Sequence, residues 1–371
     1  MRVLILSCNT GQGHNSAAAA IKDQLQAKGH CCDTVDSLQF IAPWVSAAVA
    51  KGHILIYRYL PWLFRWGYGC AERNRSIFHH NSLIYRFLTH GSARLYHFCA
   101  ANKYDAIVAV HVFSALMLTD AASKYTLNAK TYFLATDYTC SPTTEQSDLD
   151  GYFIPSPMLA EEFAKYGIPR DKLIPSGLPI RSDFFQRVSK GEAKQRLGIP
   201  AEHPHLLMMC GSMGCGPMKR LTLRLAQKIP DENALTVVCG TNKKLYRKLT
   251  KRLREHRNIR ILGYADNIPL LMDSADLYIT KPGGISVTEA AAKELPMVFI
   301  DAVAGCEEFN MHYFIQRGGA VTAKGVTELT RLCVKLMGQP QTRAKLSKAL
   351  CDMQLQNSAE YICQYIEGAL K

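Results

Sequence analysis

Residues 277–289 read Leu277-Tyr-Ile-Thr-Lys281-Pro-Gly-Gly-Ile-Ser-Val-Thr-Glu289, and this stretch decides the fold. An apolar strand is followed by two glycines and then by a helix that carries a carboxylate. Glycines let backbone N–H groups approach an anion closely, and a helix N-terminus carries about half a positive charge. We therefore expect a phosphate group at this corner. Glu289 is placed to accept hydrogen bonds from two adjacent hydroxyls, such as those of a ribose.

A related corner lies near the start of the chain, after an apolar strand predicted at residues 3–7. Its sequence is Ser7-Cys-Asn-Thr-Gly11-Gln-Gly13-His14-Asn-Ser16, which resembles GxGxxG with a serine at the third position. Asp33 and Asp36 follow about 20 residues later, so an NAD-dependent oxidoreductase is one alternative. No lysine follows the glycines, which argues against a Walker A loop. One corner in each half predicts two α/β domains.

The rest of the chain alternates short apolar runs with helical patterns, which predicts an α/β fold with parallel sheets. The predicted strands are 3–7, 106–110, 131–135, 152–154, 172–174, 206–210, 235–239, 259–262, 277–280 and 297–300. We predict an N-terminal Rossmann-like domain over residues 1–185, a second one over 186–340, and closing helices over 341–371. Residues 181–204 are polar and mixed and are predicted to link the two domains.

Composition narrows the class of protein. The chain has 371 residues, 48% of them hydrophobic, and is expected to lack a signal peptide and transmembrane helices. Its 13 cysteines are scattered and contain no CxxC pair, which favours reduced thiols in the cytosol and no metal site. The net charge of +13 indicates an anionic partner, namely nucleic acid, an anionic membrane or a nucleotide substrate.

Three polar groups lie at the predicted strand ends of the first half. His14 begins a helix, His111 follows the strand at 106–110, and Asp137 follows the strand at 131–135. The carboxyl ends of parallel strands share one edge of a sheet, so the three side chains are expected to converge on an acceptor site. His14 is the candidate general base, and Asp137 would orient it or act as the base instead. Each of the three has a simpler reading as a capping or loop-bonding residue.

Four turns of the second half are expected to lie on one side of their domain. They are the glycine turn at 211–217, the segment 262–268, the corner at 281–284 and the segment 304–310. Four loops at one edge suit a nucleotide-sugar, whose base, ribose, phosphates and sugar would each contact a different loop. The candidate donor-binding residues are Ser212, Met213, Gly214, Tyr264, Gly283, Gly284, Ser286, Glu289, Glu307 and Asn310.

The segment from residue 40 to residue 100 has a composition that predicts contact with a membrane surface. It holds all three tryptophans, Trp44, Trp62 and Trp66, and residues 51–100 contain seven Lys or Arg and a single acid. Aromatic rings interleaved with arginine suit the interface of an anionic bilayer. Gly13, Trp62, Arg65 and Trp66 are therefore the candidate acceptor and membrane contacts. A buried hydrophobic hairpin is the simpler reading, and nucleic acid is not expected because no known RNA- or DNA-binding module accompanies the segment.

Taken together, these motifs resemble the glycosyltransferase family of monogalactosyldiacylglycerol synthases and processive diacylglycerol glucosyltransferases, and more distantly MurG. The resemblance covers nearly the whole chain and rests on Gly11–His14, Ser176–Ile180, Lys281–Glu289 and residues 304–310. It implies a GT-B fold, with two Rossmann-like domains facing a central cleft. It also implies a UDP-sugar donor, inversion at the anomeric carbon, no metal and no other cofactor. By the same resemblance Glu289 would bind the ribose, Ser286 a phosphate, and Glu307 and Asn310 the sugar.

The implied activity is hexose transfer, from UDP-glucose or UDP-galactose to a diacylglycerol-type lipid. The protein would be a peripheral enzyme on the cytoplasmic face of the membrane. Three departures from the family leave the sugar and the acceptor open: Met213 stands where a Glu is frequent, Cys306 stands where the family has Gln, and the His that usually follows the Asp137 position is absent. MurG-like transfer to a polyprenyl-linked sugar, and a non-catalytic nucleotide-sugar sensor, are the further alternatives.

Overall fold

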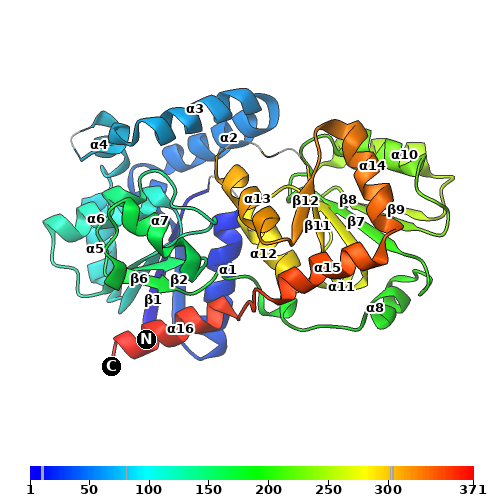
Figure 1. The fold of residues 1–371 in the computed structure, drawn as a ribbon. Helices are drawn as coiled ribbons and strands as arrows, with labels where there is room; N and C mark the ends of the chain where they lie inside the picture. Colours follow the sequence, from blue (N-terminus) through cyan, green and yellow to red (C-terminus); the bar gives the residue numbers. More distant parts are fainter. Residues whose placement is uncertain (10–11, 81, 301, 303–304) are drawn as a thin grey trace. The chain divides into compact units, whose positions relative to one another are not determined.

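The computed structural model describes residues 1–9, 12–80, 82–300, 302 and 305–371 (Figure 1). Ten side chains within the described helices lie outside this description: Ala50, His53, Ile54, Tyr57, Arg58, Tyr59, Pro61, Phe64, Arg65 and Ser76. The predicted contact Arg65 is therefore described in its backbone alone. Thr10, Gly11 and Ala304, which belong to two of the predicted loops, also lie outside the described residues.

The chain folds into two compact units. Unit 1 comprises Met1–Ser182, the described part of Val303–Phe309, and Gln356–Lys371. Unit 2 comprises Asp183–Ala302 and Asn310–Leu355. The end of the chain thus returns to the unit in which the chain begins.

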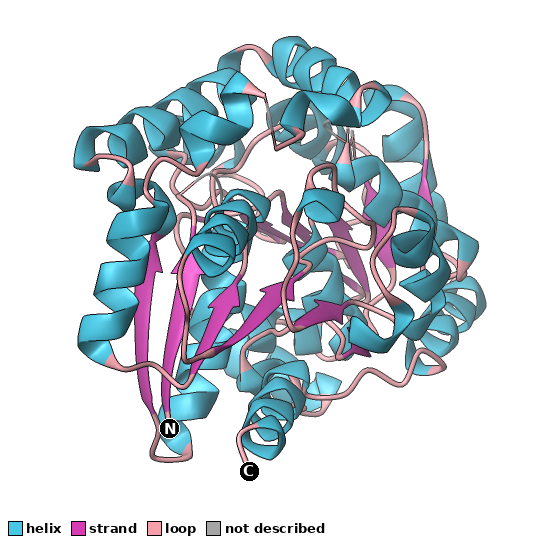
Figure 2. Cartoon of the chain, turned by 90° about the vertical axis from the view of Figure 1, so that its left-hand side faces the viewer, coloured by secondary structure: helices cyan, strands magenta, loops and turns pink. Residues whose placement is uncertain are grey.

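The sheet of unit 1 has six parallel strands in the order β2-β1-β3-β4-β5-β6. Figure 2 shows these strands side by side with helices packed against them. The strands are β1 (Arg2–Ser7), β2 (Cys31–Asp36), β3 (Ala106–Ala109), β4 (Lys130–Leu134), β5 (Gly151–Ile154) and β6 (Leu173–Pro175). Strand β3 is an apolar run buried along its whole length, as expected for a parallel strand covered on both faces.

The helices of unit 1 fill the connections between these strands. They are α1 (Gln12–Ala27), α2 (Pro43–Tyr59), α3 (Pro61–Arg73), α4 (Leu83–Leu88), α5 (Ser92–Asn102), α6 (Val112–Lys124), α7 (Ala160–Lys165) and α16 (Ser358–Ala369). Short 3₁₀ turns include η1 (Ser37–Phe40), η2 (Arg75–Phe78) and η3 (Thr144–Gln146). Among the described residues, no helix has both the length and the hydrophobicity that crossing a bilayer requires.

The sheet of unit 2 is also six-stranded and parallel, in the order β12-β11-β10-β7-β8-β9. Its strands are β7 (His205–Met209), β8 (Ala234–Val238), β9 (Ile259–Leu262), β10 (Leu277–Thr280), β11 (Met297–Phe299) and β12 (Ala320–Thr322). Its helices are α8 (Lys190–Leu197), α9 (Met218–Ala226), α10 (Lys243–Leu253), α11 (Ile268–Ser274), α12 (Gly284–Ala292), α13 (Cys306–Gln316), α14 (Gly325–Met337) and α15 (Pro340–Cys351). The first residues of α13, 306–309, are grouped with unit 1. Two parallel α/β units confirm the predicted fold class.

Two predictions at this level need correction. Strands β2 and β12 were not predicted, because both are edge strands with mixed burial rather than apolar runs. The predicted linker at 181–204 contains α8, which packs against α11. The Ser189 hydroxyl accepts from the Glu192 N–H at its start, and Gly198 ends the helix in a left-handed conformation. A polar helix with good caps had no apolar periodicity by which to recognise it.

Each sheet reverses its strand order at one point, and ligands of open α/β sheets bind there, beyond the carboxyl ends of the strands. In unit 1 the reversal lies between β1 and β3, since the chain goes from β1 outward to β2 and then to the other side of β1. In unit 2 it lies between β7 and β10. The loops that follow these four strands are therefore where a site is expected.

Candidate functional site

His14 lies in the first turn of α1, directly after β1. Its Nδ1 atom is 2.8 Å from the carbonyl oxygen of Val110, the residue that follows β3. The same Nδ1 is 2.9 Å from the Thr136 hydroxyl, beyond the end of β4. A carbonyl oxygen only accepts hydrogen bonds, so Nδ1 must carry the ring proton. In the neutral imidazole the lone pair is then on Nε2, which is the state that a general base requires.

His111 lies beside His14, with 4.6 Å between the ring centroids, but its hydrogen bonding is the opposite. It is the N-cap of α6, and its Nδ1 accepts a hydrogen bond from the Phe113 N–H at 3.1 Å. The proton of the neutral ring is therefore on Nε2, which makes this atom a donor. The predicted convergence of the two histidines is found, and the tautomers favour His14 as the base. His111 serves as a cap as well.

Asp137 follows Thr136 and is half-buried. The loop after it is anchored by two charged groups. The Glu162 carboxylate accepts from the Thr139 hydroxyl and from the Cys140 N–H, each at 2.7 Å. Arg75 donates to the Cys140 carbonyl and to Glu145, each at 3.0 Å. Asp137 thus begins a loop whose backbone is held in place, which suits a carboxylate that must be pre-oriented.

In unit 2, the glycine turn after β7 is locked to the loop after β8. The Ser212 carbonyl accepts from the Thr241 N–H at 2.8 Å, and the Gly214 carbonyl accepts from the Asn242 side chain at 3.0 Å. Gly214 has φ of 54°, and a Cβ there would be 2.3 Å from the Cys239 carbonyl oxygen, so only glycine fits. In a planar peptide the N–H points opposite to the C=O. The Met213 N–H therefore points away from Thr241, as binding an anion would require.

The corner after β10 has the predicted form. Gly283 is the N-cap of α12, and most residues of this helix are buried. Gly283, Ser286 and Glu289 are half-buried and, at a spacing of three, lie on one accessible face. The fully buried Asn310 donates to the Pro282 carbonyl at 2.9 Å and so holds the loop before Gly283. The N-terminus of α12 therefore faces the same side as one hydroxyl and one carboxylate, a combination that suits a phosphate and a ribose.

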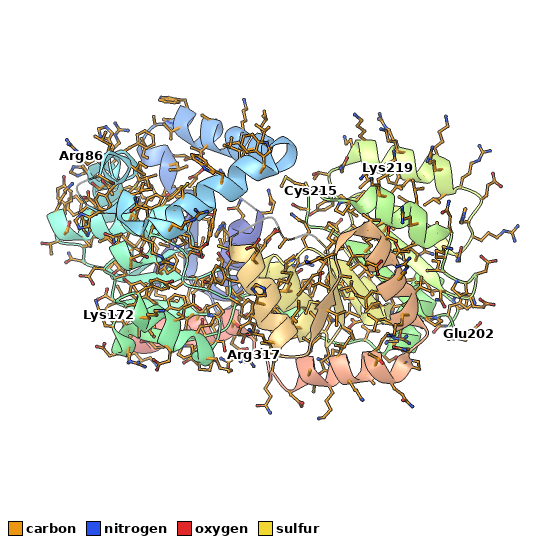
Figure 3. All side chains as sticks on the ribbon, turned by 45° about the horizontal axis from the view of Figure 1, so that its top comes forward. Arg86, Lys172, Glu202, Cys215, Lys219 and Arg317 are labelled. Carbon is orange, nitrogen blue, oxygen red and sulfur yellow. The ribbon has the colours of Figure 1, made fainter. Side chains whose placement is uncertain are left out.

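The remaining predicted donor residues lie on two other segments. Tyr264 is 72% exposed and follows β9, in an open depression of unit 2. The depression is lined by Leu197, Arg260, Leu262, Gly263, Tyr264, Ala265, Asp266, Asn267 and Leu271. Glu307 is half-buried in the first turn of α13. Cys215, labelled in Figure 3, lies within the glycine turn described above.

The predicted membrane contacts lie on α3 and next to the catalytic candidates. Trp62 and Trp66, four residues apart on one face of α3, are each 65% exposed, and Trp44 on α2 is 70% exposed. Gly13 is exposed beside His14. Three tryptophans with most of their surface in solvent contradict the buried-hairpin reading of this segment for these residues.

Two carboxylates that would support a dinucleotide site have structural partners instead. The Asp33 carboxylate accepts from Tyr104 at 2.8 Å and from Arg2 at 3.0 Å, and these partners hold its pKa below the ordinary value. Asp36 caps η1 through the Leu38 N–H at 2.9 Å.

Sequence reasoning missed Thr136 and the Val110 carbonyl, which orient His14. Both residues could have been found from their positions at strand ends, directly before His111 and Asp137. No group of His, Cys, Asp or Glu that could hold a metal occurs within the described residues.

Two family models match the chain. Residues 14–180 match the model described as monogalactosyldiacylglycerol (MGDG) synthase, and residues 218–350 match the model of group 1 glycosyl transferases. The processive diacylglycerol beta-glucosyltransferase of Bacillus subtilis is 26% identical over 368 residues, which cover 98% of this chain and 94% of the relative.

Solved structures are similar to the whole chain. The crystal structure of MurG from Acinetobacter baumannii has a TM-score of 0.65 at 15% identity and covers 99% of each chain. That of Alr3699/HepE from Anabaena in complex with UDP-glucose has a TM-score of 0.58 at 15% identity, with 100% of this chain and 99% of the other covered. These likenesses agree with a GT-B fold. The two family models and the full-length relative confirm the resemblance seen in the motifs: the chain is similar to the glycosyltransferase family of monogalactosyldiacylglycerol synthases and processive diacylglycerol glucosyltransferases.

Proposed function

We propose that this protein transfers a hexose from a UDP-sugar to the hydroxyl of a diacylglycerol-type lipid, with inversion at the anomeric carbon. The observation that carries the proposal is the pair of corners after β7 and β10, the adjacent strands at which the second sheet reverses. The locked glycine turn supplies amides for a diphosphate, and α12 presents Ser286 and Glu289 on its accessible face. The lipid acceptor is inferred from the name of the Bacillus subtilis relative.

The chemistry follows from the residues in each unit. Nε2 of His14 would take the proton of the acceptor hydroxyl, because Nδ1 holds its own proton against the Val110 carbonyl. The acceptor oxygen would bond to the anomeric carbon as the bond from that carbon to the UDP oxygen breaks. Negative charge grows on the leaving diphosphate, where the glycine-turn amides and the α12 N-terminus would stabilise it. We propose no cofactor for this step.

We further propose that the protein works as a peripheral enzyme on the cytoplasmic face of an anionic membrane. The exposed Trp62 and Trp66 would lie at the depth of the lipid headgroups. The seven basic residues of 51–100 favour an anionic surface, by about 1 kcal/mol for each residue near it. Binding to vesicles with and without anionic lipid tests this, with Trp62→Ala/Trp66→Ala as the variant. Equal binding of the variant would contradict the assignment.

The reaction is tested by UDP release from UDP-glucose and UDP-galactose, with and without diacylglycerol in anionic vesicles. Release that depends on both lipid and one sugar, with glycolipid detected by mass spectrometry, would support the proposal. UDP release with a polyprenyl-linked sugar but not with diacylglycerol would show that the acceptor is the polyprenyl-linked sugar. Binding of UDP-sugar without turnover on any acceptor would favour a nucleotide-sugar sensor.

A further inference from the structure

Cys306 contacts three polar side chains that come from distant parts of unit 1. The Tyr68 hydroxyl is 3.1 Å from its sulfur and the Ser141 hydroxyl is 3.4 Å from it. Asp137 acts on the same thiol, through its charge and by a side-chain hydrogen bond. Residue 306 belongs to the segment of α13 that is grouped with unit 1, so this cluster lies within one unit.

The direction of each hydrogen bond follows from what each group can do. An ionised carboxylate accepts only, so the Cys306 thiol donates to Asp137, and the hydroxyls of Tyr68 and Ser141 donate to the sulfur. Burial and the neighbouring Asp137 raise the pKa of the Cys306 thiol far above its ordinary value. The thiol therefore stays protonated and remains a donor. The chain of donors runs from Tyr68 through Cys306 to Asp137.

The backbone beside Cys306 fits against the same tyrosine. Gly305 has φ of 86°, and a Cβ at this position would be 2.6 Å from the Tyr68 ring. The Tyr68 ring thus packs directly on the Gly305 backbone, which a side chain would prevent. Glu307 follows Cys306 in the first turn of α13, so the position of this candidate sugar contact is set by the same packing.

Tyr68 also connects this cluster to the exposed tryptophans. At 100° per residue, a position two residues after Trp66 lies about 200° around α3 from it. One side of α3 therefore carries Trp62 and Trp66, and the other carries Tyr68 against Gly305 and Cys306.

We propose that Tyr68 and Cys306 are positioning residues of the transfer reaction, which hold the Asp137 carboxylate and the Glu307 segment in one hydrogen-bonded cluster. The inference deepens the proposed function and rests on it. Cys306 acts here through Asp137 and not as a contact of the donor sugar.

The kinetic test compares Cys306→Ala, Cys306→Ser and Tyr68→Phe with the matched control Tyr104→Phe. Tyr104 also donates to a carboxylate of unit 1, that of Asp33, but away from this cluster. Cys306→Ala is expected to lower kcat about tenfold with KM for the UDP-sugar within about twofold, because it removes a donor to a positioned group. Cys306→Ser keeps a donor and should restore most of kcat. Tyr68→Phe should lower kcat and add little to Cys306→Ala in the double variant.

Three results would overturn the proposal. The first is a rise in KM with unchanged kcat in Cys306→Ala, which would indicate that Cys306 contacts the sugar. The others are a kcat of Cys306→Ser as low as that of Cys306→Ala, or equal kcat values of Tyr68→Phe and Tyr104→Phe. A second measurement does not need activity. Alkylation of the cysteines by iodoacetamide, followed by mass spectrometry, should find Cys306 slow beside the exposed Cys31 and Cys351. It should be slower still in Tyr68→Phe, which removes a hydrogen-bond donor that stabilises the Cys306 thiolate. An unchanged rate in Tyr68→Phe would contradict the hydrogen bond from the Tyr68 hydroxyl to the Cys306 sulfur. A wild-type protein without transferase activity but with this labelling pattern would count against the proposed function and leave the cluster intact.

Discussion

His14 and His111 differ in what they can do because their Nδ1 atoms face opposite kinds of partner. Val110 presents a carbonyl oxygen to His14, whereas Phe113 presents an N–H to His111. The rings are neighbours and chemically identical, yet the neutral forms carry their protons on different nitrogens. At the scale of single residues, the backbone around each histidine separates a candidate base from a cap.

Replacing His14 by Ala is expected to lower turnover about 100-fold or more, the usual contribution of a general base, while UDP binding is retained. His111→Asn is the matched control, because asparagine keeps the N-cap of α6 and removes the neighbouring ring. We expect a much smaller loss for this variant. Near-normal turnover of His14→Ala in steady-state assays would remove His14 from the role of base.

Glu289→Ala should weaken UDP binding about tenfold or more, since a charged hydrogen-bond partner of the ribose would be lost. The surface variant Glu255→Ala, on an exposed glutamate of the same unit, provides the comparison. Isothermal titration with UDP measures both. Equal affinities of the two variants would contradict the ribose assignment.

His205 predicts a pH dependence of stability. It is fully buried between Ser274 and Thr236, and burial lowers its pKa from 6.5 to about 4. Between these values the unfolded chain binds a proton that the folded chain does not, so acidification from pH 6.5 to pH 4 favours unfolding, by roughly 3 kcal/mol. Urea denaturation across this range should show a shallower dependence in His205→Gln. His203→Gln, on a more accessible histidine, should behave as wild type, and a parallel loss of stability in all three proteins would rule His205 out.

At the scale of elements, α12 is fixed at both ends by side chains from other segments. Asn310 holds the loop before its first turn, and Lys293 at its C-cap donates to Asp273 of α11 at 2.8 Å and to the Gln186 carbonyl. Lys293 and Asp273 are both buried. A helix whose N-terminus must meet a diphosphate is thereby kept from shifting along its axis, which is pre-organisation by packing and buried charge.

Lys293→Met should destabilise unit 2 by about 3–5 kcal/mol, because it leaves the Asp273 carboxylate buried without its cation. The double variant Lys293→Met/Asp273→Leu should recover much of this loss, since no uncompensated charge remains. Arg331→Met breaks an exposed ion pair with Glu328 and should cost less than about 1 kcal/mol. Chemical denaturation compares the three. A Lys293→Met loss no larger than that of Arg331→Met would show that the pair is not needed.

For the molecule as a whole, α16 completes unit 1 after the chain has formed unit 2. Glu367 pairs with His30 at 2.6 Å, and the Tyr365 ring contacts Tyr132 and Phe153 of the first sheet at 6.1 and 5.6 Å between centroids. Figure 1 shows α16 beside α1, near the N-terminus. Unit 2 is thus inserted between two parts of unit 1.

Ile366→Asp is expected to destabilise unit 1 strongly and to leave UDP binding by unit 2 largely intact. Ile366 is fully buried on α16, and an unpaired buried carboxylate typically costs several kcal/mol. Ala369→Asp, at the exposed end of the same helix, is the control. Thermal unfolding with and without UDP checks this. If Ile366→Asp abolished UDP binding as well as destabilising unit 1, the two units would not fold separately.

The sequence predicted much of this architecture and less of the site. Strands such as β3 are continuous apolar runs, because both faces of a parallel sheet are covered, and such runs are visible in the sequence. The edge strand β2 shows no such run. His14 and His111 could be brought together because the ends of parallel strands share an edge. Tyr68 and Cys306 could not, since 238 residues separate them and no periodicity connects α3 with α13.

The return of α16 to unit 1 has a consequence for biosynthesis. The ribosome releases the chain from the N-terminus onward, so all of unit 2 emerges before the helix that covers α1 and the first sheet. Until then Ile362 and Ile366, which are buried in the folded protein, have not been synthesised. The apolar surface of unit 1 that they will cover stays open to solvent. Nascent unit 1 would therefore be the part of this protein that depends on chaperones during translation, although its sequence is made first.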